Sequence, residues 1–392
     1  MKRIADFKER ETMKEDLLAV GFDYYNLPST DGSNYWSDNV AYEFTIKEID
    51  RIEDATDECH QMCMEIVEEE VKKGDYNLYN FNNLQKQLIE TSWKNKDPHL
   101  YGRFDFGYDG KKLKMFEYNA DTPTSLLEAS VVQWDWLQNV EGVPNRDQFN
   151  LIHESLQKRL KEIKELTKQE HLYLIGMMEA GREDWGNLDY LADVAYSVGF
   201  NIHQLCVEEV GYNHKTKEFV DLQNENMDLV FKLYPSEWLS TSDFAQYVQG
   251  SKTKFIEPFW KMLLSNKVLM VKLWEKFKNH DLLLPAHFNQ SELEDYKFYV
   301  KKPILGREGA NISYLSKELD FYAKANGSEH SDLYEKNGFI YQEKYQMPSF
   351  DGMYPVIGSW VVGDKACGIG LREDFTPVTG NDSHFIPHYF VE

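Results

Sequence analysis

The residues between Arg103 and Glu128 carry polar side chains at a spacing that could hold a metal ion beside phosphate groups. Arg103 and Asp105 alternate with phenylalanine, and Glu117 and Asn119 alternate with tyrosine, so each pair should share one face of a strand. A hairpin would bring Asp105, Glu117 and Asn119 together, and their oxygens are the ligands that Mg²⁺ takes. Alternation is also typical of any half-buried hairpin, so the pattern alone leaves both interpretations open.

A loop rich in hydroxyl groups follows the second of these strands. Thr122, Thr124 and Ser125 lie directly before an apolar segment that is predicted to be a helix. Three hydroxyls so close together can donate to and accept from a bound molecule. This loop therefore favours the interpretation of a ligand-binding site over that of an ordinary hairpin.

A second region with potential chemistry begins at a predicted strand over 296–301 and ends in a loop bounded by Gly306 and Gly309. Glycines let backbone N–H groups approach phosphate oxygens, while Lys302 and Arg307 would supply fixed positive charge. The Gly-Lys-Ser/Thr ending of a P-loop and the spacing of a dinucleotide fingerprint are missing from this loop. The loop resembles a flap over a nucleotide, although a Gly-Arg-Glu-Gly pattern by itself is a weak signal.

Three further polar positions could contact the same nucleotide. Gln342 and Glu343 interrupt an apolar strand, which suits a segment lining an adenine and ribose pocket but equally suits an edge strand. Lys267 closes an apolar helical segment and could reach a phosphate, although most such lysines are solvated. Lys301 competes with Lys302 for the phosphate, and strand alternation together with the following proline favours Lys302.

Composition limits the classes of function. The chain has 392 residues and a formal net charge of -23, which argues against nucleic acid or an anionic membrane as partner. A cationic small molecule would be attracted, but many soluble cytosolic proteins are simply acidic, and the charge alone fits that explanation better. No signal peptide or membrane-length apolar run is evident, so we expect a cytoplasmic protein. Cys59 and Cys63 could suggest a metal site, but they continue the apolar stripe of a helix and are better explained as core residues.

The elements that must position these residues form an α/β pattern. Thr45 and Glu48 form a capping box for a helix reaching about Lys73. Apolar runs and helical periodicity predict a helix from about 147 to 166, and then strand, helix and strand over 171–178, 187–198 and 200–207, with another strand at 227–233. These lengths indicate a βαβ unit in a parallel sheet. A mostly helical stretch over 236–277 and strands at 338–345, 356–362 and 366–371 complete the expected order.

Several long motifs together resemble the synthetase domain of glutathionylspermidine synthase, and the resemblance covers nearly the whole chain. The motifs, in the family's order, are RFDF at 103–106, EYNADTPTSLLEA at 117–129, SNK at 265–267, YVKKPILGREGAN at 299–311, IYQEKYQ at 340–346 and GSWVVGDKACGIGLRED at 358–374. The resemblance implies an ATP-grasp fold with an associated pre-ATP-grasp α/β domain. We expect residues 1–140 and 250–392 to form the discontinuous catalytic core and 145–235 the α/β subdomain, without the amidase domain of the bifunctional synthases.

The activity that the resemblance implies is ligation of a carboxylate to an amine through an acylphosphate, with ATP and Mg²⁺ as cofactors. Each matching residue then receives an expected role. The metal ligands are Asp105, Glu117 and Asn119, and the residues at the reacting centre are Arg103, Arg307 and Arg372. The expected ATP contacts are Arg103, Lys267, Lys302, Gly306, Arg307, Gly309, Gln342 and Glu343, and the expected substrate contacts are Thr122, Thr124, Ser125 and Glu179.

The amine site and the substrates are less determined. Glu179, Glu183 and Asp184 are candidates to hold an amine such as a polyamine, although an exposed acidic loop explains them equally well. His384 stands where relatives tend to have arginine, which bears on substrate identity. An inactive nucleotide- or polyamine-binding protein and an ATP-grasp phosphotransferase are the alternative functions. The partners are small molecules, and a homo-oligomer is compatible with the sequence.

Overall fold

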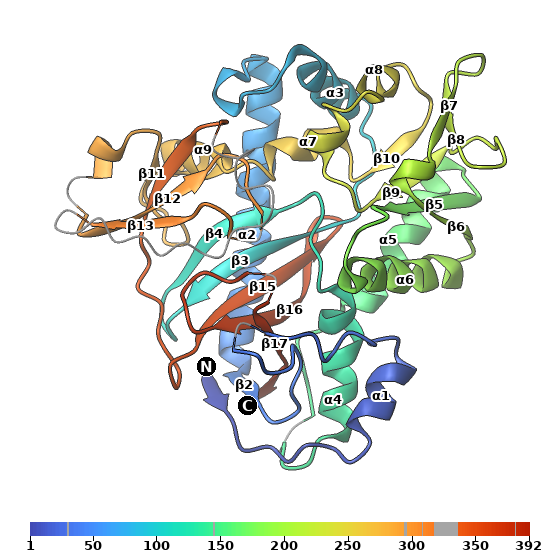
Figure 1. Ribbon diagram of the computed structural model, residues 1–392. Helices are drawn as coiled ribbons and strands as arrows, with labels where there is room; N and C mark the ends of the chain where they lie inside the picture. The colour runs from blue at the N-terminus through green and yellow to red at the C-terminus, as the bar shows by residue number, and fades with distance from the viewer. Residues whose placement is uncertain (30, 144–145, 294–295, 308, 317–335, 381) are drawn as a thin grey trace.

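A five-stranded antiparallel sheet forms the centre of the computed structural model, which describes residues 1–29, 31–143, 146–293, 296–307, 309–316, 336–380 and 382–392. The strand order is β17-β16-β15-β3-β4, so strands from distant parts of the chain lie side by side (Figure 1). The strands are β3 (Tyr101–Tyr108), β4 (Leu113–Asn119), β15 (Tyr354–Val362), β16 (Lys365–Asp374) and β17 (His384–Ile386).

Both hairpins predicted in this sheet are confirmed. β3 and β4 are joined at Asp109 and Gly110, where the Asp109 carboxylate accepts backbone hydrogen bonds from Lys111 at 2.8 Å and Lys112 at 2.6 Å. Gly110 has a φ of 85°, which glycine adopts without the steric penalty of a side chain. β15 and β16 pair as antiparallel strands around Gly363 and Asp364, as expected, with a register shift between Trp360 and Val361.

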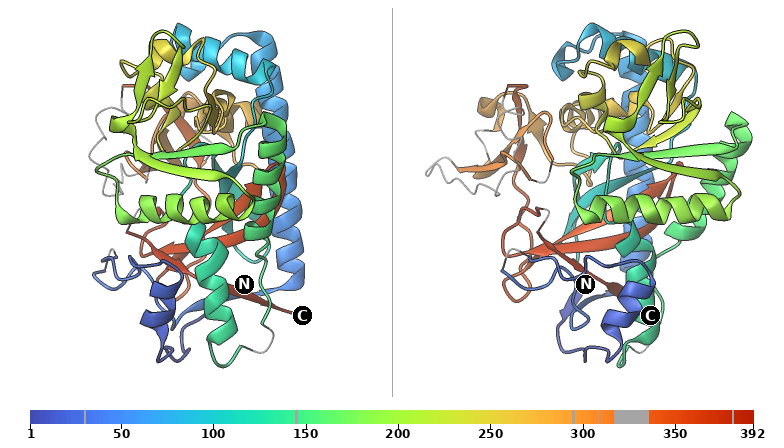
Figure 2. Two further views of the ribbon diagram at one scale, coloured as in Figure 1. Left: turned by 90° about the vertical axis from the view of Figure 1, so that its right-hand side faces the viewer. Right: turned by 45° about the vertical axis from the view of Figure 1, so that its right-hand side comes forward.

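The long helix α2 (Ile46–Lys73) runs along one face of the central sheet (Figures 1 and 2). The predicted capping box of Thr45 and Glu48 is present, and Gly74 ends the helix in a left-handed conformation. Its apolar stripe packs on β15 and β16, with Cys59 and Cys63 fully buried as free thiols. The interpretation of these cysteines as core residues is confirmed.

The predicted βαβ unit is also confirmed and belongs to a four-stranded parallel sheet of order β10-β9-β5-β6. Its elements are β5 (His171–Gly176), α6 (Arg182–Ser197), β6 (Asn201–Cys206), β9 (Leu229–Lys232) and β10 (Lys254–Ile256). Helix α6 begins earlier than residue 187, the predicted start, because Gly181 caps it and Glu183 and Asp184 occupy its first turn. Acidic residues there complement the helix dipole, but they carry no apolar periodicity that would reveal the helix.

Helix α5 (Ile152–Thr167) connects the two sheets by packing against both α6 and β15. Buried side chains of the parallel sheet, such as Leu172 and Ile175, belong to the same two hydrophobic clusters as residues of the central sheet. This continuity is what interlocked domains require. The domain boundaries remain a prediction. Strand β10 belongs to the parallel sheet but lies after residue 235, the predicted end of the α/β subdomain.

A third sheet stands beside the central one, on the left in Figure 1, with the order β11-β14-β12-β13. It contains the predicted strands over 296–301 and 338–345. The strands are β11 (Ala286–His287), β12 (Phe298–Pro303), β13 (Ser313–Ser316) and β14 (Phe339–Glu343).

The prediction of a mostly helical stretch over 236–277 is correct only in part. The structure has the short helices α7 (Ser236–Leu239) and α8 (Ala245–Val248), strand β10, a 3₁₀ helix (Phe259–Leu263) and α9 (Val268–Lys276). Gly250 and Pro258 interrupt the helical pattern, and the apolar residues of β10 pair with β9 instead. Apolar residues occur in both the helical and the strand segments of this stretch, so the sequence pattern did not indicate the division.

The two ends of the chain meet in a three-stranded sheet of order β1-β2-β18. These strands are β1 (Lys2–Ile4), β2 (Ala41–Thr45) and β18 (His388–Val391). The remaining elements are α1 (Met13–Ala19), α3 (Asn83–Lys94), α4 (Gln133–Asn139), the hairpin of β7 (Gly211–Asn213) and β8 (Glu218–Val220), and short helical turns at 77–79, 128–132, 207–209 and 290–293. Across the described ranges, no helix combines the length and apolar character that crossing a membrane requires.

Candidate active site

A cavity of about 600 Å³ lies where the central sheet, the third sheet and the carboxyl ends of the parallel strands meet. Ligands in open α/β sheets commonly bind outside the carboxyl ends of the strands. All predicted site residues except Ser125 line this cavity: Arg103, Asp105, Glu117, Asn119, Thr122, Thr124, Glu179, Lys267, Lys302, Gly306, Arg307, Gly309, Gln342, Glu343 and Arg372.

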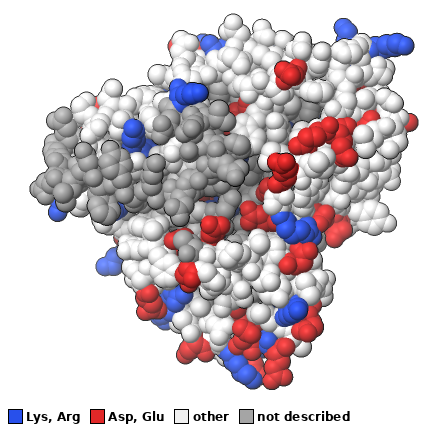
Figure 3. Space-filling model, viewed as in Figure 1, with Lys and Arg blue, Asp and Glu red and all other residues white. Residues whose placement is uncertain are grey.

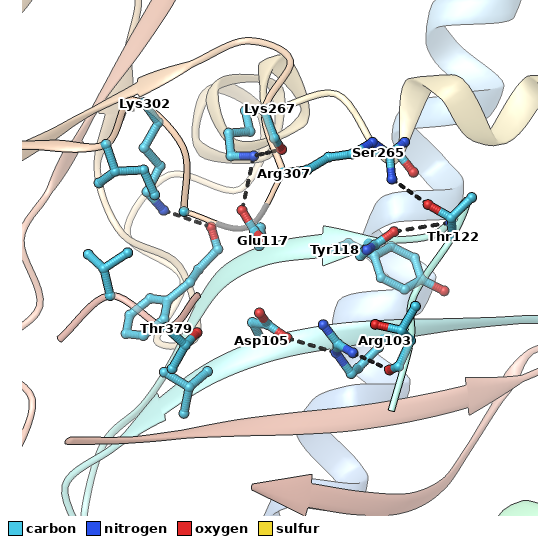
Figure 4. Close-up of a pocket in the computed structure, with 18 of the residues that line it drawn as sticks. Arg103, Asp105, Glu117, Tyr118, Thr122, Ser265, Lys267, Lys302, Arg307 and Thr379 are labelled. Atoms are coloured by element: carbon cyan, nitrogen blue, oxygen red, sulfur yellow. Dashed lines mark hydrogen bonds and ion pairs between the residues drawn. The ribbon is translucent and has the colours of Figure 1, made fainter. Parts of the chain in front are cut away.

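The β3–β4 hairpin supplies one wall of the cavity. Asp105 lies opposite Glu117 in the strand register, and Arg103 lies opposite Asn119. The Arg103 Nε donates to Asp105 Oδ1 at 3.2 Å, and its Nη1 donates to the Thr124 carbonyl at 2.6 Å (Figure 4). The strand alternation therefore places the four polar side chains on the cavity side, as the sequence predicted.

Arg103 also depends on a neighbouring glycine in β15. A Cβ atom at Gly358 would lie 2.8 Å from the Arg103 Cδ, so a larger residue there would displace the arginine. Arg372 enters the cavity from β16, on the other side of β15. Burial and the nearby charge of Arg103 lower the pKa of Arg372 from its ordinary value. Two positive charges that line one cavity favour an anion between them.

Lys267 reaches the cavity from a different place than predicted. It precedes α9 rather than closing a helical segment, because the helix begins at Val268. Its Nζ lies 3.1 Å from Glu117 Oε2 and 2.9 Å from the Gly306 carbonyl oxygen. Burial alone would raise the pKa of Glu117, yet Lys267 and Lys302 outweigh it and hold that pKa below its ordinary value.

Strand β12 presents Lys302, not Lys301, to the cavity, in agreement with the prediction from alternation. Lys302 is buried and its Nζ donates to the Phe116 carbonyl at 3.2 Å, whereas the Lys301 Nζ lies over the Phe339 ring. Burial lowers the pKa of Lys302 to about 8, and Lys267 adds to the effect. Lys302 therefore has a strong preference for an anionic partner.

The loop after β12 brings Arg307 over the opposite wall. Its Nη2 lies 2.9 Å from Glu237 Oε1 and 3.7 Å from Asp121 Oδ2, and its Nη1 donates to the Thr122 hydroxyl. Gly309 has a φ of 68°, a left-handed conformation that suits glycine. Residue 308 of the same predicted loop lies outside the described residues.

Asp121 and Glu237 are functional candidates that the sequence interpretation missed. Asp121 is buried and accepts from the Lys232 Nζ at 2.7 Å. Burial acts to raise the pKa of Asp121, but Lys232 and Arg307 hold it below its ordinary value. Glu237 follows shortly after the end of β9, and the carboxyl end of a parallel strand is the signal that could have indicated it.

The hydroxyl-rich loop is divided by the structure. Thr122 and Thr124 line the cavity, but Ser125 is buried outside its wall. The Ser125 hydroxyl interacts with Tyr35. The Ser125 backbone has a φ of 68°, directly before the helical segment that begins at residue 126. Ser125 is therefore not among the residues that line the cavity, and its assignment as a substrate contact remains a prediction.

Acidic residues occupy the side of the cavity next to the parallel sheet. Glu179, Glu183 and Asp184 line it between the end of β5 and the first turn of α6. The space-filling view shows acidic side chains gathered on this part of the visible face, over the parallel sheet and α6 (Figure 3). A cationic substrate approaching from this side would be attracted.

The donor set fits a Mg²⁺ ion that arrives with phosphate groups. Asp105, Glu117 and Asn119 offer two carboxylates and an amide, while the described residues contain no group of three His, Cys, Asp or Glu side chains arranged to hold an ion alone. Mg²⁺ is commonly bound by one or two carboxylates together with substrate phosphates and water. The role of these residues as metal ligands remains a prediction.

The third sheet provides the remaining wall. Gln342 is buried on β14, and burial raises the pKa of Glu343 beside it. Their assignment to adenine and ribose remains a prediction. His384 is not among the cavity-lining residues; its Nδ1 lies 3.2 Å from the Asn34 carbonyl oxygen and its Nε2 3.5 Å from Asp31. The structure thus places His384 against the N-terminal loop.

The geometry can be compared with known proteins. The family model described as "Glutathionylspermidine synthase preATP-grasp" matches residues 4–391. The chain belongs to the glutathionylspermidine synthase family. This membership confirms the predicted resemblance, and it confirms the predicted enzyme class, because the named relatives are ligases or synthetases.

Three relatives illustrate how this family member compares. A Haemophilus influenzae protein named for an acid–amine ligase activity is 63% identical over 392 residues, covering 100% of both chains. Trypanothione synthetase from Crithidia fasciculata is 28% identical over 327 residues, covering 76% of this chain and 48% of that protein. The bifunctional glutathionylspermidine synthetase/amidase of Escherichia coli is 25% identical over 370 residues, covering 86% of this chain and 57% of that protein.

A solved structure supports the fold of this glutathionylspermidine synthase family member. The glutathione synthetase-like effector from Globodera pallida superposes with a TM-score of 0.55 at 10% identity, covering 98% of both chains. Such low identity bears on fold alone. The predicted α/β architecture is confirmed, and the term preATP-grasp comes from the description of the matching family model.

Proposed function

We propose that this protein is an ATP-dependent carboxylate–amine ligase that forms an amide through an acylphosphate. The observation that carries the proposal is the convergence of cationic and anionic side chains on one cavity. Arg103, Arg372, Lys267 and Lys302 come from separate parts of the chain and face the Asp105–Glu117 pair. A nucleoside triphosphate with a divalent cation has the complementary charges.

In this reaction the γ-phosphoryl group of ATP is transferred to a substrate carboxylate. Lys267 and Lys302 hold phosphate oxygens, the N–H groups around Gly306 and Gly309 approach them, and Gln342 and Glu343 contact adenine and ribose. Asp105, Glu117 and Asn119 would hold Mg²⁺, which would neutralise negative charge on the phosphates when bound. Arg103, Arg307 and Arg372 stabilise the negative charge that develops on the transferring group.

The amine then attacks the acyl carbon, and phosphate leaves to give an amide. Thr122 and Thr124 contact the acyl substrate, and Glu179 with its acidic neighbours attracts the amine. The acyl substrate is a peptide-like or amino-acid carboxylate, and the net charge of -23 favours a polyamine among possible amines. A cytoplasmic location and a homo-oligomeric state remain predictions.

The proposed function is tested by incubating the purified protein with Mg²⁺, ATP and a small-molecule extract. Mass spectrometry should find ADP, phosphate and a product whose mass equals the condensation of a carboxylic acid with an amine. A stable phosphorylated product would indicate a phosphotransferase, and saturable ATP binding without ADP would indicate a binding protein. Absence of both ADP formation and an ATP-dependent thermal shift would overturn the proposal.

ATP affinity should fall as pH rises from 7 to 9, because the Lys302 ammonium, with its pKa of about 8, loses its proton in this range. Since only the charged form attracts phosphate, the dissociation constant should rise roughly tenfold by pH 9. Titration calorimetry at constant ionic strength measures this change. Lys302→Arg keeps the charge and should flatten the profile, whereas Lys301→Arg should leave it unchanged; an unaltered profile in Lys302→Arg would contradict the assignment.

A further inference from the structure

Glu237 and Arg307 form an ion pair across the cavity, between segments that follow two different sheets. Arg307 belongs to the loop after β12 in the third sheet, and Glu237 lies on α7, after β9 of the parallel sheet. The Arg307 Nη2 and Nε lie 2.9 and 3.3 Å from the same Glu237 oxygen. Both residues line the cavity. This contact therefore fixes where the loop cation stands relative to the opposite wall.

The residue before Glu237 in the chain, Ser236, is held by a cluster of buried polar groups formed by Asp121, Lys232 and Ser236, here called the Asp121 cluster. Asp121 accepts from the backbone N–H of Ser236 at 2.8 Å, from the Ser236 hydroxyl at 2.9 Å and from the Lys232 Nζ at 2.7 Å. The side chains of Lys232 and Asp121 are 0% and 1% exposed. Because charge-assisted hydrogen bonds in a dry environment are strong and directional, the first turn of α7 is held rigidly beneath Glu237.

A guanidinium on a glycine-bounded loop has many rotamers unless other groups restrain it. Glu237 restrains the Nε edge of Arg307, while Thr122 accepts from its Nη1. Glu237 is 13% exposed and Arg307 20% exposed, so solvent screens their attraction little. Fixing a cation in place before the reaction increases its effect on developing charge, since little reorganisation is then needed.

We propose that Glu237 is a positioning residue that orients Arg307 toward the transferring phosphoryl group. The inference rests on the proposed function, because it assigns Arg307 to the reacting centre. Glu237 acts through Arg307 and does not itself touch the reacting atoms. The carboxylate of Glu237 fixes the position of the Arg307 guanidinium, and the hydrogen bonds of the Asp121 cluster fix the position of Glu237.

A double-mutant cycle tests this inference with ADP formation as the readout. Glu237→Ala should lower kcat about tenfold to a hundredfold, as expected for misplacement of a catalytic group, with a smaller change in KM for ATP. In an Arg307→Ala background the same change should cost almost nothing more, because the residue it positions is gone. Glu237→Asp should recover part of the loss. Equal losses from Glu237→Ala in both backgrounds would show an independent role and overturn the inference.

A second measurement does not depend on turnover. Phenylglyoxal modifies arginine, and peptide mass spectrometry follows its addition to Arg307. Glu237→Ala should raise the modification rate of Arg307 several-fold and Glu237→Asp less, whereas Glu225→Ala, at an exposed carboxylate outside the cavity lining, should not change it. An unchanged rate in folded Glu237→Ala overturns the positioning role even if ligation is observed. If no ADP forms but the labelling follows this pattern, the proposed function fails while the Glu237–Arg307 contact stands.

Discussion

Replacing Glu117 by glutamine is expected to lower ATP-dependent turnover by about a thousandfold, equivalent to about 4 kcal/mol, because the charge that would hold Mg²⁺ beside the phosphates is removed. Glutamine keeps the size of the side chain but not its charge. Lys267, 3.1 Å from Glu117, would also lose its counterion, so the phosphate-binding cations would be less well placed. Steady-state ADP formation at saturating ATP measures the loss.

Asp109→Asn is the matched control for this change. Asp109 lies in the turn of the same hairpin, outside the cavity lining, and asparagine can keep its hydrogen bonds to Lys111 and Lys112. This variant should retain turnover. Circular dichroism and thermal unfolding should show both variants folded. Near-normal ADP formation by a folded Glu117→Gln variant would remove Glu117 from the proposed metal site.

Replacing Arg103 by alanine is expected to lower kcat by about a hundredfold to a thousandfold, the usual cost of removing a preorganised donor to developing charge. Arg103 is a largely buried residue of the cavity wall, with its guanidinium fixed by Asp105 and the Thr124 carbonyl. Arg103→Lys keeps one positive charge but loses the forked geometry, so an intermediate loss is expected. Single-turnover measurement of phosphoryl transfer separates this effect from substrate binding.

Arg159→Ala provides the comparison for Arg103→Ala. Arg159 lies on α5 away from the cavity lining, where it donates to the His99 carbonyl at 2.8 Å and pairs with Glu162. Its loss should leave kcat close to that of the unmodified protein. Were Arg103→Ala to retain most of its activity while remaining folded, the reacting centre would have to be sought elsewhere in the cavity.

Much of the fold was predictable because its signals are local. The capping box of Thr45 and Glu48, the turn at Asp109 and Gly110, and the alternation that turns Lys302 inward each involve residues within one element. Local backbone geometry determines such features regardless of the rest of the chain. The parallel βαβ unit followed from element lengths for the same reason.

Other features could not be predicted from local pattern. The start of α6 carries acidic residues without apolar periodicity, and the segment over 236–277 divides because β10 finds a partner in β9. Ser125 shared its composition with Thr122 and Thr124, yet a left-handed backbone turns it away from the cavity. In each case a tertiary contact or a single backbone conformation outweighed the sequence pattern.

The sequence by itself determined which side chains each strand offers to one face, including Asp105 with Arg103 and Glu117 with Asn119. Period-two alternation of the backbone is sufficient for that. Tertiary structure alone decided which of these faces meet: Lys267 beside Glu117, and Arg307 beside Glu237, 70 residues away in the chain. Such pairs depend on how whole sheets pack around shared cores, and that packing free energy is a sum over many residues that no single motif contains.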